Sequence, residues 1–392
     1  MLRKILTKAK DRLKVRTYEW LVEEQLRTDP AYSPARLRLA FEARPNDDID
    51  DADTIRRIIE AYSKAKSIQR TLGEEYHESN EWLPIYSSYL KPIMTALAGR
   101  NVDAVRRTYR NFWRDPCSTG LVGLPVDMAA NFFGEEIKPK FRRLALRDGG
   151  YRLRLWHNLA GRTAAVSQLV SPTIGNPYGY LVEGQFVKAG SDYLHHYAAH
   201  LARLAKASRK QVVVELGGGF GGMAYYLLRD NPDTTYLDYD LPENMALAAY
   251  YLITAMPNKR IALFGETEPA LGPKTDYDAL LMPSFALRDL PERSAGVVFN
   301  SYSLAEMSPL TISLLVTEFM RIAGTYIFHV NHNRHSKVIA DDFGFEAGPF
   351  DRIYKIPALW NHARNQDMDE YEFLYQRCVQ QPEGTQEHCA VA

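Results

Sequence analysis

The sequence predicts an α/β protein in which a doubly wound sheet follows a mainly helical N-terminal domain. First, a strand-like run of β-branched residues at 212–214 leads into the glycine-rich segment 217–222. Second, apolar strand-like and helix-like segments alternate from there to residue 331, as in sheets with helices on both faces. Third, two late strand-like segments, 351–356 and 371–379, close the domain with no long helix between them.

The length and composition indicate a two-domain globular protein. At 392 residues the chain exceeds what one simple core usually supports. Hydrophobic residues make up 46% and charged residues 24%, and the formal net charge of zero gives no indication of nucleic-acid binding. We expect a helical lid or dimerisation domain at 1–165, a linker loop and lid helix at 166–205, the α/β domain at 206–380 and a disordered tail at 381–392.

Cysteine usage and hydropathy suggest a cytoplasmic protein. Cys117, Cys378 and Cys389 lie far apart without a C-x-x-C pair, so neither a disulfide framework nor a cysteine metal site is expected. No apolar run reaches membrane-spanning length, and the N-terminus lacks the apolar core of a signal peptide. We therefore expect an intracellular location.

Residues 1–27 show the pattern of a basic amphipathic helix. Apolar residues recur at helical spacing between Leu2 and Leu13, and lysines and arginines fill most other positions. One interpretation is peripheral docking on an anionic membrane surface at the inner membrane face. The other, which we favour, is a helix packed on its own domain with a solvated basic face.

From Ser33 to about Val170 the apolar spacing stays helical. One stripe consists of Ile55, Ile58, Ile59, Tyr62, Ile68 and Leu72. The acidic run 47–51 suits a helix N-terminus or a solvated loop better than a metal site. We interpret the region as a helical domain that dimerises, covers the active site, or does both.

A turn-rich segment, 172–180, separates this region from the α/β domain. A helix with Ser191 as its candidate N-cap follows, and His196 lies off its apolar face. One interpretation is a lid in which Asn176 and Tyr178 contact the substrate. The alternative is an ordered interdomain linker with surface histidines.

The glycine-rich segment predicts a tight strand-to-helix turn at a nucleotide-type site. Gly217, Gly219 and Gly222 fit the G-x-G-x-x-G of dinucleotide-binding folds. Glu215 with Gly217, Gly219 and Gly221 fits the E-x-G-x-G-x-G of class I S-adenosylmethionine (SAM) methyltransferases, which this segment resembles. Glu215 favours SAM, because an acid is unfavourable beside a pyrophosphate but suits the cationic amino-acid end of SAM. A glycine-rich loop without a ligand is the third interpretation.

A second strand, 234–240, ends in a carboxylate at the spacing expected for an acid that binds both ribose hydroxyls. We prefer Asp240 to Asp238 because Asp240 lies at the carboxyl end of the strand. Pro242 then begins a helix. The run Asp240-Leu241-Pro242 also resembles the D-L-P of one group of small-molecule O-methyltransferases, whose aspartate holds the SAM ribose. An NAD enzyme would carry the same acid, so this feature supports the fold more than the cofactor.

The rest of the α/β domain continues the alternation. Further strands are expected at 260–264, 279–285, 295–300 and 325–331, with a polar turn at 301–307. Ser308-Pro309 is expected to cap a helix that ends before Gly324.

From about residue 172 onward the chain resembles the sugar O-methyltransferases. The resemblance lies in Gly175-Asn176-Pro177-Tyr178-Gly179, in the loop 215–221, in Asn300-Ser301-Tyr302-Ser303-Leu304-Ala305-Glu306-Met307 and in His329-Val330-Asn331. The turn from Asn300 to Met307 is more specific than the glycine loop, and the first 150 residues are covered much less. The resemblance implies a Rossmann-like methyltransferase sheet, and the closing strand pair resembles the antiparallel last strand of class I methyltransferases. It also implies methyl transfer from SAM to a sugar hydroxyl of a glycan, glycolipid or sugar-containing metabolite, as in polysaccharide biosynthesis.

The motifs and the resemblance together give a set of expected site residues. Cofactor contacts are expected from Glu215, Gly217, Gly218, Gly219, Gly221, Asp240, Leu241, Pro283, Ser284 and Asn300. Substrate contacts are expected from Asn176, Tyr178, Tyr302, His329 and Asn331.

Because the SAM methyl group is already activated, the protein must chiefly align the acceptor oxygen and accept its proton. In the D-L-P methyltransferases the base is a histidine in the turn after the fourth strand, where this chain has Ala305. Glu306 is therefore the first candidate, His332 the second and His196 the third. A bound Mg²⁺ is an alternative way to activate the hydroxyl, but no clear carboxylate set marks a metal site.

Two other function classes compete. An NAD(P)-dependent nucleotide-sugar oxidoreductase would need a Tyr-x-x-x-Lys pair or its equivalent, and none is convincingly placed after the fourth strand. A non-catalytic SAM-fold subunit would scaffold a glycan-assembly complex through its helical half, but the intact glycines and Asp240 argue against it. A sugar or glycan acceptor is the expected partner, with homo-oligomers also expected and no nucleic acid.

Overall fold

The computed structural model describes residues 27–45, 51–78, 82–122, 138–269, 276–334, 338–363 and 367–378, with single positions at 13, 16, 17, 20, 21, 23, 24 and 365. Most of the predicted helix at 1–27, the acidic positions 47–50 and the tail 381–392 lie outside the described residues. Within them, no helix is long and apolar enough to cross a membrane.

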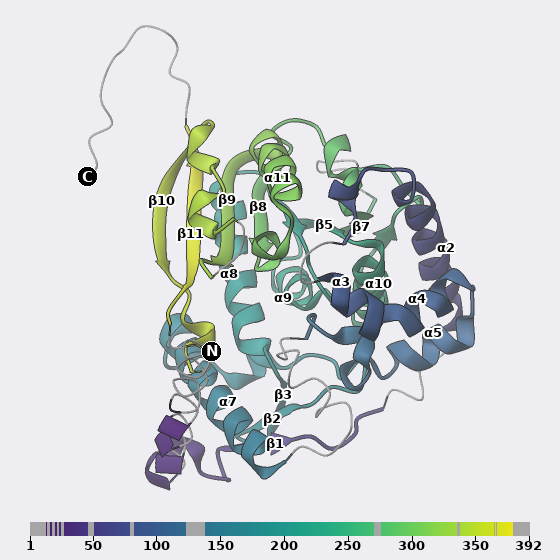
Figure 1. The fold of residues 1–392 in the computed structure, drawn as a ribbon. Coiled ribbons are helices and arrows are strands. Elements are labelled where there is room, and N and C mark those ends of the chain that lie inside the picture. Colours follow the sequence, from purple (N-terminus) through teal and green to yellow (C-terminus); the bar gives the residue numbers. More distant parts are fainter. Residues whose placement is uncertain are drawn as a thin grey trace, which may run out of the picture.

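The centre of the protein is an eight-stranded sheet with the order β10-β11-β9-β8-β4-β5-β7-β6 (Figure 1). The strands are β4 Val212–Leu216, β5 Thr235–Asp240, β6 Ile261–Leu263, β7 Ala279–Pro283, β8 Ala295–Ser301, β9 Ala323–His332, β10 Phe350–Pro357 and β11 Glu370–Arg377. From β4 the chain builds outward through β5, β7 and β6, and then returns to β8 on the other side of β4. Open α/β sheets bind ligands at such a switch point, beyond the carboxyl ends of the strands.

The last strand confirms the predicted doubly wound, Rossmann-like methyltransferase sheet. The pairs from β6 to β9 are parallel, whereas β11 is inserted between β9 and β10 and runs antiparallel to both. A sheet wound only from strand–helix–strand units would be parallel throughout. The short link between β10 and β11 makes the antiparallel insertion possible.

Helices cover both faces of this sheet. Helices α8 (Ser191–Ala207), α9 (Gly222–Asp230) and α10 (Pro242–Ala255) pack on one face, and α11 (Pro309–Ile322) packs on the other. Along β4, Val213 belongs to the first core cluster, whereas Val212 and Val214 belong to the second. This alternation follows from the two-residue period of a strand, and it explains why the central strands are apolar on both faces.

The N-terminal part is mainly helical, as predicted. Its principal helices are α2 Ala52–Gln69, α3 Trp82–Ile85, α4 Lys91–Ala98, α5 Val102–Tyr109 and α7 Pro139–Ala160, with a π-helical turn at Tyr86–Leu90. Helix α2 packs on α10, and α4 and α5 pack on α2, at the opposite side of the molecule from β10 and β11 (Figure 1).

A small antiparallel sheet was not anticipated. Strand β1 (Leu37–Ala40) pairs with β2 (Gly179–Val182), which pairs with β3 (Gln185–Lys188). The segment interpreted as a linker or lid therefore contains a β-hairpin that is tied to residues far earlier in the chain. At Gly179 a Cβ atom would lie 2.1 Å from the carbonyl oxygen of Val187, so the close pairing of β2 and β3 requires glycine.

One continuous core joins the N-terminal helices to the sheet. Apolar residues of α2 and α10 belong to the same buried cluster. Between these helices, Lys66 Nζ lies 2.9 Å from Glu243 Oε1, and the Tyr62 hydroxyl donates to the same oxygen at 3.0 Å. The Glu243 side chain is 1% exposed, so this pair is a buried polar link across the α2–α10 interface.

Glu243→Ala should lower the free energy of unfolding by about 3 kcal/mol, because it leaves the Lys66 ammonium without its carboxylate in a buried interface. Urea denaturation measures the effect. The control is Glu60→Ala on α2, the helix that carries Lys66; it removes an exposed pair with Arg100 and should change stability by less than about 0.5 kcal/mol. Equal losses in the two variants would contradict the role of the buried pair.

Candidate functional site

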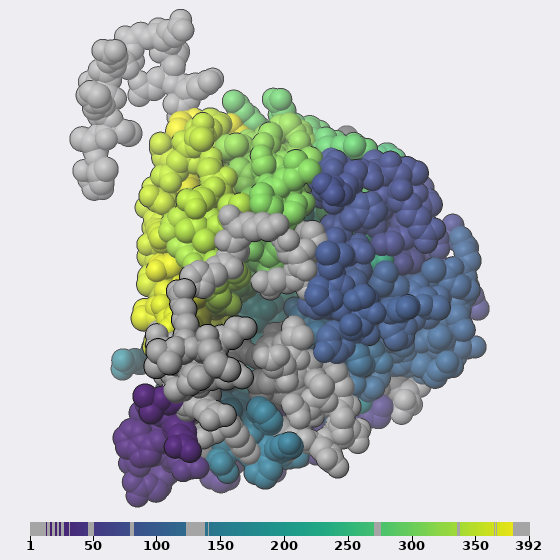
Figure 2. All heavy atoms as spheres, in the orientation of Figure 1, coloured from purple at the N-terminus to yellow at the C-terminus, as the bar shows by residue number. Residues whose placement is uncertain are grey.

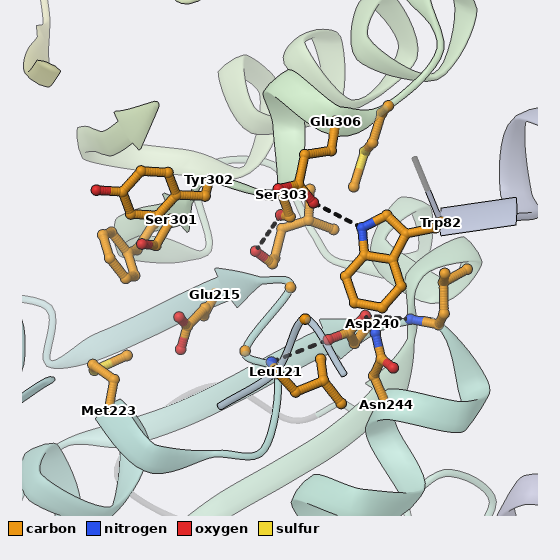
Figure 3. A pocket seen from close by; sticks show the side chains of 18 of the residues that line it. Trp82, Leu121, Glu215, Met223, Asp240, Asn244, Ser301, Tyr302, Ser303 and Glu306 are labelled. Carbon is orange, nitrogen blue, oxygen red and sulfur yellow. Dashed lines mark hydrogen bonds between the residues drawn. The ribbon is translucent and has the colours of Figure 1, made fainter. Parts of the chain in front are cut away.

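A cavity of about 610 Å³ opens at the carboxyl ends of the central strands, at the switch point between β4 and β8. Its walls come from the glycine loop after β4, the end of β5, the turn after β8 and the end of β9. Residues of the N-terminal part, including Trp82 and Leu121, complete it (Figure 3). Figure 2 shows the N-terminal helices and the C-terminal half of the chain side by side on one face of the molecule. The volume is typical of small-molecule sites.

The glycine loop is bound to two aspartates of β5. Gly218 N–H donates to Asp238 Oδ1 and Gly219 N–H donates to Asp240 Oδ2, both at 3.1 Å. A Cβ atom on Gly218 would lie 2.6 Å from that Asp238 oxygen, so the contact requires glycine. The loop therefore presents acidic side chains next to its backbone, and the two amide groups are already used.

Three buried carboxyl groups surround this loop. Glu215, Asp238 and Asp240 are 3%, 1% and 7% exposed. Burial raises the pKa of Glu215 to about 8, although the Tyr236 hydroxyl donates to it at 2.5 Å. Burial also raises the pKa of Asp240 to about 6, against hydrogen bonds from Asn244 and from backbone N–H groups. The pKa of Asp238 rises through burial and the neighbouring Asp240 and Glu215, and its Oδ2 atom has no hydrogen-bond partner among the described residues.

Carboxyl groups in this arrangement favour a cationic ligand. Each is costly to ionise in a buried site, and each ionised group makes the next harder to ionise. A positive charge placed among them would lower their pKa values and restore the ionised forms. Glu215 and Asp240 line the cavity, and Asp238 lies beneath the loop.

The turn after β8 is held rigidly by buried amide side chains. Asn300 Nδ2 donates to Leu216 O at 2.9 Å and to Ser303 Oγ at 2.5 Å. Asn331 Nδ2 donates to Asn300 Oδ1, and Asn331 Oδ1 accepts from Ala305 N–H. These bonds join the turn to β4 and β9, so its position relative to the glycine loop is set by the sheet.

This turn places Glu306 and Tyr302 at the cavity. Glu306 Oε2 accepts a 2.8 Å hydrogen bond from Trp82 Nε1, which links the turn to the N-terminal part (Figure 3). Tyr302 has φ 65° and ψ −32°, an unfavourable conformation for a side chain of this size, and its hydroxyl donates to Glu370 Oε2 at 2.7 Å. Ser308 caps the following helix α11, as predicted, by accepting from Thr311 N–H.

The structure brings ten of the predicted site residues to the cavity wall. They are Glu215, Gly217, Gly218, Gly219, Asp240, Leu241 and Ser284 of the predicted cofactor set, and Tyr302, Glu306 and His332 of the predicted acceptor and catalytic sets. His332, at the end of β9, is buried at 6% exposure.

Three predicted cofactor residues do not line the cavity. Gly221, at φ 82°, lies against Leu252 and allows the turn into α9. Pro283 pairs with Asp240 in the sheet register, one residue before Ser284. Asn300 is fully buried and positions the turn after β8.

The predicted substrate contacts in the 172–180 turn need correction. Asn176 accepts from Arg44 N–H at 2.5 Å and donates to Asn111 at 2.6 Å. Tyr178 is 2% exposed and packs against Trp113 with ring centroids 5.6 Å apart. Both residues join the N-terminal part to the small sheet, and neither lines the cavity. Their contacts are internal, so the structure does not support a substrate-binding role.

The same correction applies to His329, Asn331 and His196, which also lie off the cavity wall. His329 is fully buried and stacks on Phe373 at 4.5 Å, and burial lowers its pKa to about 3. Asn331 is fully buried and bonds to Asn300. His196 packs against Trp360 at 5.3 Å, and its pKa falls to about 4 through burial, so it is not positioned as a base for this cavity.

Sequence reasoning missed several wall residues. Trp82, Arg152, Trp360, Asn361 and Glu370 come from segments that carry no motif. Glu370 was detectable only in part, because an acid at the first position of the inserted strand must face the end of β9, where it pairs with His332 in the register. Nothing in the local sequence pattern relates Trp82 or Arg152 to the sheet.

The described part of the chain contains no candidate set of metal ligands. No group of three or more His, Cys, Asp or Glu side chains among these residues is arranged to hold an ion. The expected alternative of a bound Mg²⁺ therefore has no candidate ligand set here.

Comparisons with known proteins give similarity of fold only. No family model and no curated protein matches the chain. The magnesium protoporphyrin IX methyltransferase of Synechocystis PCC 6803, solved with bound SAM, is 9% identical, with 50% of this chain and 86% of that chain covered and a TM-score of 0.30. A glycopeptide N-methyltransferase complexed with sinefungin is 13% identical, with 46% and 94% covered and a TM-score of 0.31. A protein of Pyrococcus horikoshii OT3 is 12% identical, with 46% and 91% covered and a TM-score of 0.31. Similarities of this size do not identify a reaction or a substrate.

Glu215 should make the ligand-free protein less stable as the pH rises from about 4.5 to 8. Its folded-state pKa of about 8 lies above the ordinary value of 4.5, so over this range the unfolded chain is ionised while the folded protein holds the proton. Glu215→Gln removes this contribution, and the variant should gain stability relative to the wild type as the pH rises through that window.

Urea denaturation of both proteins between pH 5 and 8.5 measures this difference. Glu372, with a pKa raised by burial to about 7, is present in both proteins, so its contribution cancels in the comparison. Glu346→Gln, which alters an exposed pair with Arg352, should leave the pH dependence unchanged. Parallel curves for wild type and Glu215→Gln would show that Glu215 ionises normally.

Proposed function

We propose that this protein is a SAM-dependent O-methyltransferase whose acceptor is a sugar hydroxyl. The observation that carries the proposal is the acidic lining of the glycine loop. Gly218 and Gly219 N–H groups, which would bind a pyrophosphate in a dinucleotide enzyme, donate instead to Asp238 and Asp240. A diphosphate here would lose these donors and face three buried carboxyl groups, whereas SAM brings a net positive charge.

Different lining residues suit different parts of SAM, and they follow one another along the carboxyl ends of the strands. Asp240, at the carboxyl end of β5, is suited to accept hydrogen bonds from the two ribose hydroxyls. Leu241 and Ser284 continue the wall on the β5–β7 side, where the adenine would lie. Glu215, on β4, would face the ammonium group of the amino-acid end. When bound, SAM supplies a methyl group activated by its sulfonium.

The chain's own contribution is to orient the acceptor and receive its proton. Glu306 lies on the rigid turn after β8, across the cavity from Glu215 (Figure 3). Its hydrogen bond from Trp82 fixes the orientation of the carboxylate, whose other oxygen would accept the proton as a general base. His332 is the second candidate, since it also lines the cavity.

The sugar acceptor is supported by the wall on the β9–β11 side. Tyr193, Tyr302 and Trp360 supply aromatic surface, and Asn361, Arg152 and Glu370 supply polar groups. Aromatic faces beside fixed hydrogen-bonding groups suit a ring that carries hydroxyls. This composition agrees with the family resemblance of the turn from Asn300 to Met307.

Calorimetric titration with S-adenosylhomocysteine, NAD and NADP tests the cofactor. We expect binding of S-adenosylhomocysteine alone, with affinity that increases with pH up to about 8, because the ammonium group favours the ionised forms of Glu215 and Asp240 and displaces their protons. Asp240→Asn should weaken binding about 10- to 100-fold, since a neutral amide replaces the charged acceptor.

Asp230→Asn is the matched control. It lies at the far end of α9, bonded to Arg229 and away from this cavity, and should bind normally. Binding of NAD or NADP in place of S-adenosylhomocysteine would contradict the proposed cofactor and indicate an oxidoreductase. Binding of none of the three would favour a non-catalytic scaffold.

Glu306→Gln should reduce kcat for methyl transfer by at least about 100-fold while the affinity for S-adenosylhomocysteine stays within about twofold. The amide keeps the shape and can still accept from Trp82, but it cannot accept a proton. The measurement uses labelled SAM with an acceptor identified by screening glycans.

Trp82→Phe provides the comparison, because it removes the hydrogen bond and keeps the carboxylate. It should retain most of the activity that Glu306→Gln loses. Full turnover by Glu306→Gln would show that Glu306 is not the general base, and His332 would become the first candidate.

A further inference from the structure

A short 3₁₀ turn of the N-terminal part, Glu74–Tyr76, and the two residues that follow it contribute to the cavity wall. The lining residues are Glu75, Tyr76, His77 and Glu78, which we call the segment 75–78. Arg288, in the turn that begins at Ser284 after β7, has its Cζ atom 5.9 Å from the centre of the Tyr76 ring. The segment 75–78 is therefore close to the end of β7, on the side of the cavity where we place the adenine of SAM.

Hydrogen bonds from the end of α2 hold this segment in place. Gln69, which is fully buried, donates from Nε2 to the carbonyl oxygen of Tyr76 at 2.7 Å. Its Oε1 atom accepts from Lys66 Nζ at 2.8 Å, and Lys66 also pairs with Glu243 in the first turn of α10. Since α10 begins directly after Leu241, these bonds fix the segment relative to the end of β5.

The carboxylate of Glu78 lacks a donor in this arrangement. Glu78 is half-buried in the cavity wall, and its Oε2 atom is buried without a hydrogen-bond partner among the described residues. An acceptor withdrawn from water without a donor costs free energy, which a donor on a bound ligand would recover.

The charge of Glu78 acts at the same place as that of Asp240. Burial raises the pKa of the Tyr86 hydroxyl, and the charges of Glu243, Asp240 and Glu78 raise it further. The three carboxylates are therefore grouped around one buried tyrosine. This agrees with a position of Glu78 near the predicted ribose site.

We propose that Glu78 accepts a hydrogen bond from the exocyclic amino group of the SAM adenine and so selects adenine over purines that lack this group. The inference rests on the proposed function and adds a cofactor contact from outside the α/β part. A carboxylate only accepts hydrogen bonds, and the donors of SAM near this side of the cavity are the ribose hydroxyls and the adenine amino group. Asp240 is placed to accept from the hydroxyls, which leaves the amino group for Glu78.

The test compares S-adenosylhomocysteine with its analogue in which hydrogen replaces the purine amino group. In calorimetric titrations of the wild type, the analogue should bind at least about tenfold more weakly, because it leaves the carboxylate without its donor. This measurement needs no substitution, so it does not depend on the folding of a variant.

Variants of Glu78 then assign the discrimination to this residue. Glu78→Ala removes the acceptor, and the two ligands should bind with affinities within about twofold of each other. Glu78→Gln keeps a neutral acceptor and should give an intermediate ratio.

Two further variants are the controls. Glu74→Gln changes an exposed carboxylate of the same turn that does not line the cavity, and it should keep the wild-type ratio. Asp240→Asn should weaken both ligands and leave their ratio unchanged, because Asp240 is placed at the ribose.

Equal binding of the two ligands by the wild type, or a wild-type ratio in folded Glu78→Ala, would overturn this inference alone. If Glu78→Ala instead abolished discrimination against a deoxyribose analogue, Glu78 would be a ribose contact and the adenine contact would be wrong. Failure of S-adenosylhomocysteine to bind the wild type would overturn the proposed cofactor and this inference with it.

Discussion

The site depends on carboxyl groups that are buried against the glycine loop. Asp238 and Asp240 accept the N–H groups of Gly218 and Gly219, so the second strand of the sheet holds the loop after the first. These bonds stabilise the tight turn, but they leave acidic groups with raised pKa values in a buried site. A cationic ligand relieves this cost, whereas a diphosphate would increase it. In the function we propose, this way of holding the loop is the reason for a preference for SAM over a dinucleotide.

A second constraint is that the N-terminal helices and the α/β part share one hydrophobic core. The apolar faces of α2 and α10 belong to one core, and the buried Lys66–Glu243 pair crosses their interface. The same union brings Trp82 to Glu306, and α7 brings Arg152 to the end of the cavity. The N-terminal part is thus a structural component of the site, and it supplies walls that the sheet alone does not have.

The rigidity of the turn after β8 explains why several polar residues of the motif are buried. Asn300 and Asn331 use their amides to join the turn to β4 and β9, and these bonds position Tyr302 and Glu306. From the sequence alone, the polar residues of this turn and of β9 are expected to contact ligands. In the structure the run divides into side chains that face the cavity and side chains that hold the backbone in place.

Features that depend on residues close together in the sequence were predicted, whereas features that depend on distant residues were missed. Local patterns gave the central strands, the glycine turn, the Ser308 cap and the acid at the end of β5, because each depends on residues close together in the sequence. The antiparallel last strand was also predicted, because the closing strand pair without a long helix resembles that of class I methyltransferases. The hairpin of β2 and β3 was missed because its pairing partner, β1, lies about 140 residues earlier in the chain, and a segment of turns looks the same whether or not such a partner exists.

What the sequence determined by itself was therefore the fold of the α/β part and the half of the cavity wall that follows its central strands. Glycine positions, strand ends and the acid after the second strand are set by backbone sterics and by the rule that ligands bind at the carboxyl ends of parallel strands. The tertiary structure decided the other half. It removed Asn176, Tyr178, His329 and Asn331 from the predicted substrate contacts by burying them, and it gathered Arg152, Asn361 and Glu370 into one wall. Hydrogen bonds and charge balance among residues more than 200 positions apart have no periodicity in the sequence, so only the folded chain reveals them.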